Sequence, residues 1–184
     1  AVKRALVVAD MPFLSYQTSI KDAITNAGRF LKAGAQAVKP EGGAEFAETI
    51  KALVNSGIPV LAHIGMLPQS VHKLGGYTTQ GAEEASAKKL LEDAHAVEEA
   101  GAFAVVLEKV EEKTAKKITE ELSIPTIGIG SGPYCDGQIL VVNDILGLFD
   151  RFTPPFVKKY ANLKEEIIKA AKKFAEDVRE KKFP

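Results

Sequence analysis

The chain has 184 residues, of which 46% are hydrophobic, so it is long enough for one domain with a sizeable core. Lys plus Arg and Asp plus Glu number 24 each, so no net charge favours nucleic acid or an anionic membrane as a partner. The single cysteine, Cys135, suits a reducing compartment, and no apolar run approaches the roughly 20 residues that span a bilayer. We therefore expect a cytoplasmic protein with no membrane segment and no nucleic-acid partner.

Apolar, β-branched runs alternate along the chain with segments of helical periodicity. The runs predict strands at residues 4–10, 36–40, 58–63, 103–108 and 125–130, with a weaker sixth at 139–142. The segments between them predict helices from Ser19 to Gly34 and over residues 44–56, 82–100 and 113–122. Beyond these we expect a short helix or two within 136–148, a loop at 152–155 and an amphipathic C-terminal helix within 161–181. This alternation is typical of βα units around a parallel sheet.

Nearly every predicted strand is followed, within a residue or two, by a side chain that can do chemistry. Since the carboxyl ends of parallel strands share one rim, these side chains are expected to converge although they are far apart in sequence. The residues concerned are Asp10, Lys39, Glu41, His63 and Glu108. This pattern indicates an enzyme.

Two of the rim residues, Asp10 and Glu41, are carboxylates at successive strand ends. Hard oxygen ligands of this kind suit Mg²⁺, which takes one or two carboxylates together with water and substrate oxygens. The alternative is that Asp10 only begins the turn at Asp-Met-Pro and that Glu41 is solvated in Pro-Glu-Gly-Gly.

The two basic candidates are Lys39 and His63. Lys39 shares a strand face with Glu41 and suits a substrate carboxylate or a developing enolate; the alternative is a salt bridge to one of the rim carboxylates. His63 follows an apolar strand and suits a hydrogen bond to substrate or proton exchange; the alternative is a structural histidine.

Glu108 leaves the apolar strand 103–107, and such surroundings favour a carboxylate that acts as a general base. The alternative is that Glu108 serves as an ion partner of Lys109 or Lys39. The glycine-rich segment 128–132 follows the next strand and offers backbone amides to a ligand, but its spacing is neither a dinucleotide fingerprint nor a Walker loop.

Read together, the sequence strings along the chain resemble the ketopantoate hydroxymethyltransferase family. The strings are, in order, Ala-Asp-Met-Pro-Phe (9–13), Val-Lys-Pro-Glu-Gly-Gly (38–43), Ala-His-Ile-Gly (62–65), Pro-Gln-Ser (68–70), Gly-Gly-Tyr (75–77), Gln-Gly (80–81), Leu-Glu (107–108), Ile-Gly-Ile-Gly-Ser-Gly (127–132) and Cys-Asp-Gly-Gln (135–138). No single string is decisive, but the ordered set is specific and covers essentially the whole chain.

The resemblance implies an α/β fold of the TIM (βα)₈ barrel family, of the phosphoenolpyruvate/pyruvate type. It implies a homo-oligomeric, cytoplasmic transferase of pantothenate and coenzyme A biosynthesis that uses Mg²⁺ and moves a hydroxymethyl group from methylene-tetrahydrofolate, its cosubstrate, to 3-methyl-2-oxobutanoate. Carried over residue by residue, Asp10 and Glu41 would serve the metal, Asp10, Lys39 and His63 the 2-oxo acid substrate, and Glu108 would be the proton acceptor.

The largest departure from the family is that its first two βα units have no counterpart here. We therefore expect about six of the eight βα units in a single barrel domain over residues 1–184. Two alternative functions stay open: a related Mg²⁺-dependent oxo-acid lyase or mutase, which would commonly need a reactive lid cysteine, and a catalytically silent barrel fragment.

Overall fold

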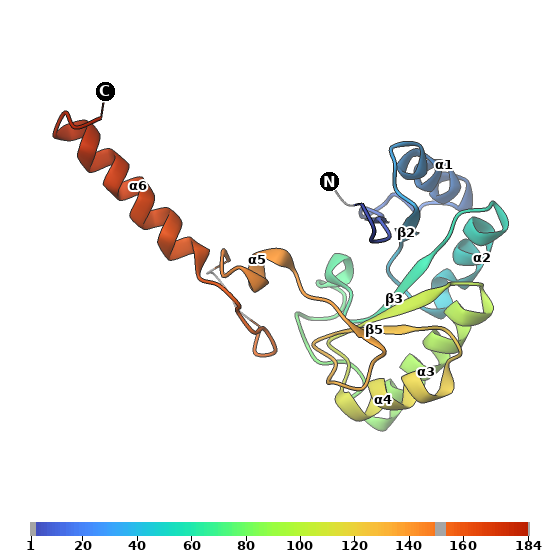
Figure 1. Cartoon of the computed structure of the whole chain (residues 1–184). Coiled ribbons are helices and arrows are strands. Elements are labelled where there is room, and N and C mark those ends of the chain that lie inside the picture. The colour runs from blue at the N-terminus through green and yellow to red at the C-terminus, as the bar shows by residue number, and fades with distance from the viewer. Residues whose placement is uncertain (1–2, 150–153, 184) are drawn as a thin grey trace. The chain divides into compact units, whose positions relative to one another are not determined.

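A computed structural model describes residues 3–149 and 154–183 of the chain. Their contacts group into two compact units, Ala1–Gln138 and Ile139–Pro184. The first unit holds the sheet and the helices α1 to α4, and the second holds α5 and α6 (Figure 1). The single domain expected over 1–184 stays a prediction.

All strand pairings named in the first unit are parallel. The strands are β1 (Val8–Asp10), β2 (Ala37–Lys39), β3 (Leu61–Gly65), β4 (Ala104–Glu108), β5 (Thr126–Ile129) and β6 (Gly137–Gln138). β1 pairs with β2, β3 to β6 pair in sequence order, and a parallel bridge between Val38 and Val60 connects the two groups. Strands that pair in the order of the chain are what successive βα units produce, so the predicted parallel α/β fold is confirmed.

The predicted sixth strand at 139–142 is wrong in position. β6 pairs with β5 through Gly137 and Gln138 instead. The carboxylate of Asp136 accepts a hydrogen bond from the backbone N of Thr126 at 2.8 Å, and the pairing with β5 begins at the next residue, Gly137, two residues before the apolar run. Val141, from that run, is half exposed, at 52%.

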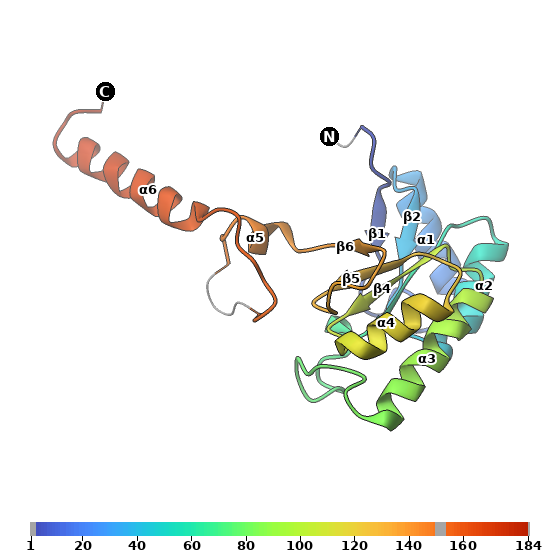
Figure 2. The ribbon, with the colours of Figure 1, turned by 60° about the horizontal axis from the view of Figure 1, so that its bottom comes forward.

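Helices cover one face of this sheet (Figures 1 and 2). They are α1 (Ile20–Lys32), α2 (Ala47–Asn55), which follows the short 3₁₀ turn η1 (Ala44–Phe46), α3 (Glu84–Glu99) and α4 (Glu112–Glu121). Ser19 caps α1 as predicted, because its hydroxyl accepts a hydrogen bond from the backbone N of Asp22 at 3.0 Å. The main core lies between these helices and the sheet and includes Val38, Ala62, Val105 and Leu107.

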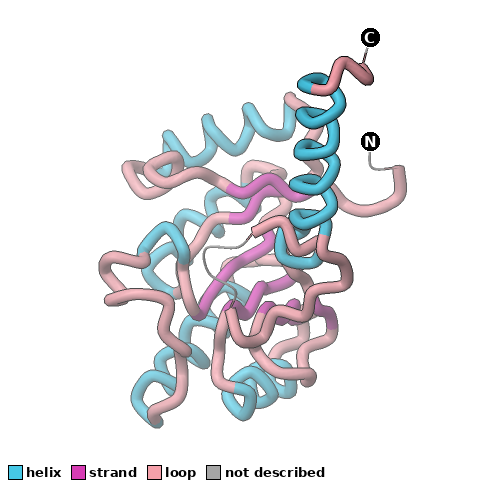
Figure 3. Tube along the Cα trace, turned by 90° about the vertical axis from the view of Figure 1, so that its left-hand side faces the viewer, coloured by secondary structure: helices cyan, strands magenta, loops and turns pink. Residues whose placement is uncertain are grey.

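The opposite face of the sheet carries a smaller apolar cluster, formed by Leu61, Ala104, Val106 and Ile129. Alternate residues of a strand point to opposite faces, so the two clusters divide β3 and β4 between them. Figure 3 shows the strands side by side, with helices outside them. We call the face without the helices the inner face, because it corresponds to the interior of a barrel.

The second unit contains the short helix α5 (Val142–Ile145) and the C-terminal helix α6 (Leu163–Arg179), which lies within the predicted segment 161–181. The predicted loop at 152–155 falls partly outside the described residues. In residues 3–149 and 154–183, no helix combines the length and the hydropathy that a membrane span requires.

Candidate active site

Strand alternation places two of the predicted rim residues, His63 and Glu108, on the inner face. His63 lies two residues after Leu61 in β3, and Glu108 lies two residues after Val106 in β4. Residues two apart in a strand point to the same face, and Leu61 and Val106 belong to the inner cluster. Asp10 and Lys39 end neighbouring strands in direct register. His63 and Glu108 therefore lie on the inner face of the sheet, and Asp10 and Lys39 lie at the carboxyl ends of their strands.

The first contact in the site is an ion pair between Lys39 Nζ and Asp10 Oδ1, 2.8 Å apart. The Lys39 side chain is 15% exposed, whereas that of Asp10 is 70% exposed. The alternative that Lys39 forms a salt bridge to a rim carboxylate is thus realised. It leaves most of the Asp10 carboxylate open to solvent and to a ligand.

Lys39 also fixes the tautomer of His63, because Nζ lies 3.3 Å from His63 Nδ1. An ammonium group only donates, so Nδ1 must accept, and a neutral His63 then carries its hydrogen on Nε2. Nε2 lies 3.2 Å from Glu108 Oε2, within ion-pair distance. The two atoms are nevertheless not aligned for a hydrogen bond, and Nε2 is buried without a hydrogen-bond partner among the described residues. The imidazole therefore presents an unused donor beside Glu108.

Glu41 is buried, with 6% of its surface exposed, which contradicts the alternative of a solvated glutamate. Its Oε2 accepts a hydrogen bond from the backbone N of Gln69 at 3.0 Å, and its Oε1 lies 4.0 Å from His63 Nδ1. Burial raises the pKa of this carboxyl group, because desolvation disfavours the charged form. A carboxylate in such a place is stabilised by a cation that approaches it.

Glu108 is held at the end of β4 by its backbone. Its carbonyl oxygen accepts a hydrogen bond from the backbone N of Met66 at 2.8 Å, and the next residue, Lys109, has a left-handed φ of 49°. Lys109 Nζ donates to the carbonyl oxygen of Tyr77, and the ion pair of Glu108 among the described residues is with His63. The alternative of a Glu108–Lys109 pair is therefore not what the structure shows.

In the glycine-rich segment, Ser131 holds the end of β4. Ser131 is buried, and its hydroxyl donates to the carbonyl oxygen of Leu107 at 2.7 Å and accepts from the backbone N of Val110 at 2.9 Å. These contacts fasten the chain on both sides of Glu108. The sequence contained the motif but gave no sign of this role, because the partners are 21 and 24 residues away.

The donor set suits Mg²⁺ by its chemistry, since Asp10 and Glu41 supply hard oxygens and Mg²⁺ commonly keeps water and substrate in its other positions. Within residues 3–149 and 154–183 there is no group of three or more His, Cys, Asp or Glu side chains able to enclose a metal ion. Protein side chains of the described part would therefore hold such an ion only partly. The observation that fits a cation is that Glu41 is buried while its Oε1 accepts no hydrogen bond from the described residues.

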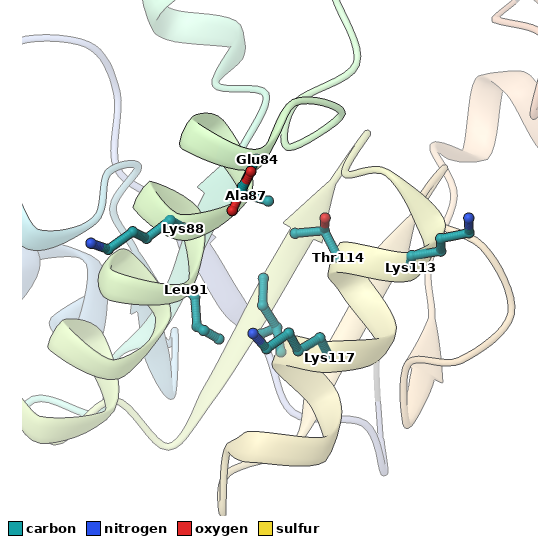
Figure 4. A pocket seen from close by; sticks show the side chains of 8 residues that line it. Glu84, Ala87, Lys88, Leu91, Lys113, Thr114 and Lys117 are labelled. Carbon is teal, nitrogen blue, oxygen red and sulfur yellow. The ribbon is translucent and has the colours of Figure 1, made fainter.

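A cavity of about 390 Å³ lies elsewhere, between α3 and α4 (Figure 4). Its lining includes Ala87, Leu91, Thr114 and Ile118 from the facing sides of the two helices, and none of the five rim residues. The cavity is a gap between neighbouring helices and is separate from the rim.

A parallel α/β sheet whose strand ends bring acid, base and imidazole together defines an enzyme of the (βα) barrel class. Solved structures of that class resemble the fold at low identity. A candidate phosphonomutase from Burkholderia cenocepacia J2315 has a TM-score of 0.56 and 16% identity, covering 74% of this chain and 63% of that one. δ-Aminolevulinic acid dehydratase from Toxoplasma gondii ME49 has a TM-score of 0.51 and 16% identity, covering 70% of this chain and 48% of that one.

The particular family follows from sequence comparison. The family model for ketopantoate hydroxymethyltransferase matches residues 1–184, and the chain belongs to that family. A 3-methyl-2-oxobutanoate hydroxymethyltransferase of Geobacter metallireducens is 58% identical over 98% of this chain and 68% of its own length. The enzyme of the same name from Thermotoga neapolitana is 60% identical over 98% of this chain and 67% of its own. The chain thus spans about two thirds of the length of these relatives and is related to transferases throughout.

Proposed function

We propose that the rim catalyses the Mg²⁺-dependent transfer of a hydroxymethyl group from methylene-tetrahydrofolate to 3-methyl-2-oxobutanoate. The product would be ketopantoate, for pantothenate and coenzyme A biosynthesis, made by a cytoplasmic homo-oligomer. The observation that carries the proposal is the convergence of Asp10, Lys39, Glu41, His63 and Glu108 through contacts of 2.8 to 4.0 Å. The names of the relatives support the transfer of a hydroxymethyl group to 3-methyl-2-oxobutanoate, whereas Mg²⁺ and methylene-tetrahydrofolate belong to the proposal.

The carboxylates of Asp10 and Glu41 would hold the ion. When bound, Mg²⁺ supplies positive charge that lowers the energy of an enolate formed on a 2-oxo acid. Glu41 would offer Oε1 to the ion, because Oε2 already accepts the hydrogen bond from the backbone N of Gln69. Asp10 would offer its carboxylate, which is 70% exposed, to the same ion.

Lys39 and His63 would bind the oxo acid. Lys39 brings a positive charge to the rim beside Asp10, which suits the substrate carboxylate. His63 offers its Nε2 hydrogen, which has no hydrogen-bond partner among the described residues, to a substrate oxygen that lies near Glu108. A donor that is already buried and fixed costs little reorganisation when substrate arrives.

Glu108 would be the base. The bond between C3 of the oxo acid and its hydrogen breaks, the proton moves to a Glu108 carboxylate oxygen, and the electron pair stays on the substrate as an enolate. C3 then forms a bond to the methylene carbon, and the two bonds from that carbon to the folate nitrogens break. Their electron pairs stay on the nitrogens, each of which takes up a proton, so that the folate leaves as tetrahydrofolate. Since a hydroxymethyl group carries an oxygen that a methylene group lacks, water must supply the hydroxyl by mass balance.

Proton removal can be tested without folate. NMR follows the exchange of the C3 hydrogen of 3-methyl-2-oxobutanoate for solvent deuterium with Mg²⁺ present, and the wild-type protein is expected to accelerate it. Glu108→Gln keeps the shape but not the basicity, so we expect exchange to fall by about 10²- to 10⁴-fold. Glu120→Gln, at an exposed position of α4, is the matched control and is expected to exchange like the wild type.

Exchange by Glu108→Gln at the wild-type rate would contradict the assignment of the base. A wild-type protein that neither exchanges the hydrogen nor binds the oxo acid would support the catalytically silent alternative. The lyase or mutase alternative is disfavoured by Cys135, which is 9% exposed and whose thiol pKa is raised by burial, unlike a reactive lid cysteine.

A further inference from the structure

We propose that Tyr16 and Gln69 are positioning residues that together fix the carboxylate of Glu41 relative to Asp10. The proposal rests on the proposed function, in which these two carboxylates would hold the cation. It assigns a role to two buried or half-buried polar side chains outside the five rim residues. Neither Tyr16 nor Gln69 would touch the reacting atoms.

Tyr16 controls the backbone of Glu41. The tyrosine lies in the segment between β1 and α1 and is only 2% exposed. Its hydroxyl accepts a hydrogen bond from the backbone N of Glu41 at 3.0 Å and donates to the carbonyl oxygen of the same residue at 2.9 Å. One side-chain oxygen therefore satisfies both main-chain polar groups of Glu41, which lies just beyond the end of β2 (Ala37–Lys39).

The tyrosine ring is itself held in place. It packs edge-on against Phe46 of the turn η1, with ring centroids 5.3 Å apart. Phe46 also lies where a side chain on Gly42 would be, since a Cβ at Gly42 would come within 2.3 Å of it. The hydroxyl thus points at Glu41 from a packed ring, and its position is set by the core.

Gln69 controls the carboxylate of Glu41 and connects it to the strand that carries Asp10. It belongs to the 3₁₀ turn η2 (Pro68–Ser70), and its backbone N donates to Glu41 Oε2 at 3.0 Å. Its side-chain Nε2 donates to the carbonyl oxygen of Met11, the residue after Asp10, at 2.8 Å. Gln69 therefore connects the Glu41 carboxylate to the backbone of Met11, next to Asp10.

These contacts leave Glu41 one oxygen for a ligand. Among the described residues no hydrogen bond reaches Oε1, whereas Oε2 is occupied by Gln69. A carboxylate held in this way binds a cation through one oxygen whose direction is fixed. The expected consequence of losing the contacts is a change in affinity, because partners of metal-binding carboxylates typically alter metal affinity by about 10- to 100-fold.

The variant that tests this inference is Tyr16→Phe, which keeps the ring and removes the hydroxyl. Tyr134→Phe, which removes a hydroxyl from a side chain that is 48% exposed, is the matched control. Calorimetric titration with Mg²⁺ in the presence of 3-methyl-2-oxobutanoate is expected to show about 10- to 100-fold weaker binding by Tyr16→Phe and wild-type binding by Tyr134→Phe.

A second readout does not need a ligand. Hydrogen exchange of the Glu41 amide, followed by NMR, is expected to be at least about tenfold faster in Tyr16→Phe, while the amide of Val106 in β4 exchanges as in the wild type. If Tyr16→Phe does not fold, Gln69→Met replaces it, because it removes the bond to Met11 and retains the backbone N. Gln69→Met is then expected to weaken Mg²⁺ binding over the same range.

Unchanged Mg²⁺ affinity together with unchanged Glu41 exchange in Tyr16→Phe would overturn the inference. Should the wild-type protein bind neither Mg²⁺ nor the oxo acid, the proposed function fails, and the exchange of the Glu41 amide still decides whether Tyr16 holds this residue. In that case, faster exchange of the Glu41 amide in Tyr16→Phe would by itself support the role of Tyr16 in positioning Glu41.

Discussion

His63 and Glu108 face each other across neighbouring parallel strands, with Nε2 and Oε2 3.2 Å apart. Their register, in which His63 lies opposite Val106 and Gly65 opposite Glu108, places the imidazole two residues before the carboxylate along the sheet. On the other side of the imidazole, Nδ1 lies 3.3 Å from Lys39 Nζ. The His63 ring therefore lies between the Lys39 ammonium group and the Glu108 carboxylate.

The first prediction concerns the tautomer of His63. Because Lys39 can only donate to Nδ1, the hydrogen of neutral His63 is expected on Nε2, and Lys39→Met is expected to release this preference. Nitrogen-15 NMR of the imidazole distinguishes the two tautomers directly. His72, which is exposed, serves as the internal control and is expected to give the same signals in both proteins. A wild-type spectrum with the hydrogen on Nδ1 would contradict the arrangement.

A second prediction concerns Gly65, the last residue of β3. It has a φ of +95°, and a Cβ there would lie 2.4 Å from the backbone oxygen of Glu108. Gly65→Ala therefore combines backbone strain with a clash that a flexible side chain cannot relieve, and we expect it to cost about 2 kcal/mol or more of unfolding free energy. Urea unfolding measures the change.

The same substitution in α1 is the control for Gly65. A Cβ at Gly28 meets nothing within 4 Å, and alanine favours a helix over glycine, so Gly28→Ala is expected to stabilise the protein by up to about 1 kcal/mol. Equal effects at the two positions would show that the contact with Glu108 does not matter.

A third prediction concerns Ser131. Ser131→Ala leaves the carbonyl of Leu107 and the backbone N of Val110 without the hydroxyl that joins them, in a buried place. We expect a loss of about 1–3 kcal/mol in unfolding free energy. Ser56→Ala, which removes an exposed hydroxyl bonded to the carbonyl of Ala52, is expected to change it by less than about 0.5 kcal/mol. A Ser131→Ala protein as stable as Ser56→Ala would show that the Ser131 hydroxyl does not stabilise the end of β4.

The sequence predicts the first five strands and the helices because these depend on local periodicity. Apolar runs and helical spacing are read within one segment, and alternation along a strand then assigns His63 and Glu108 to the same face as the inner cluster. The family strings independently mark the same strand ends. The order of strand pairing also follows, because successive βα units pair as neighbours.

What the sequence does not predict depends on contacts between distant segments. Tyr16 reaches Glu41 across 25 residues and Gln69 reaches Met11 across 58, and neither residue type signals such a role locally. The position of β6 is not predictable for a similar reason, because β6 follows the contact between Asp136 and Thr126 and not the apolar run. The direction of the Lys39 ammonium, and with it the tautomer of His63, likewise needs the folded chain.

The fourth prediction is a pH dependence at Glu98, near the end of α3. Its Oε1 accepts hydrogen bonds from the hydroxyl and backbone N of Ser123 at 2.6 and 2.7 Å and from the backbone N of Ile124 at 3.2 Å. The hydrogen bond from the Ser123 hydroxyl is the main reason that the pKa of Glu98 lies below its ordinary value of 4.5. The charged carboxylate therefore fastens the turn that precedes β5.

Because the folded pKa is lower than the unfolded one, this group stabilises the protein fully above pH 4.5, and the contribution is lost as the pH falls through the folded pKa. We expect Glu98→Gln to be about 1 kcal/mol less stable than the wild type at pH 7, since the bonds to a charged acceptor are lost, and the difference to vanish in more acidic solution. Urea unfolding from pH 7 to pH 3 checks this, with Glu99→Gln as the exposed neighbouring control, expected to match the wild type throughout. A gap between Glu98→Gln and the wild type that stays constant with pH would mean that the shape of the side chain, and not its charge, holds Ser123.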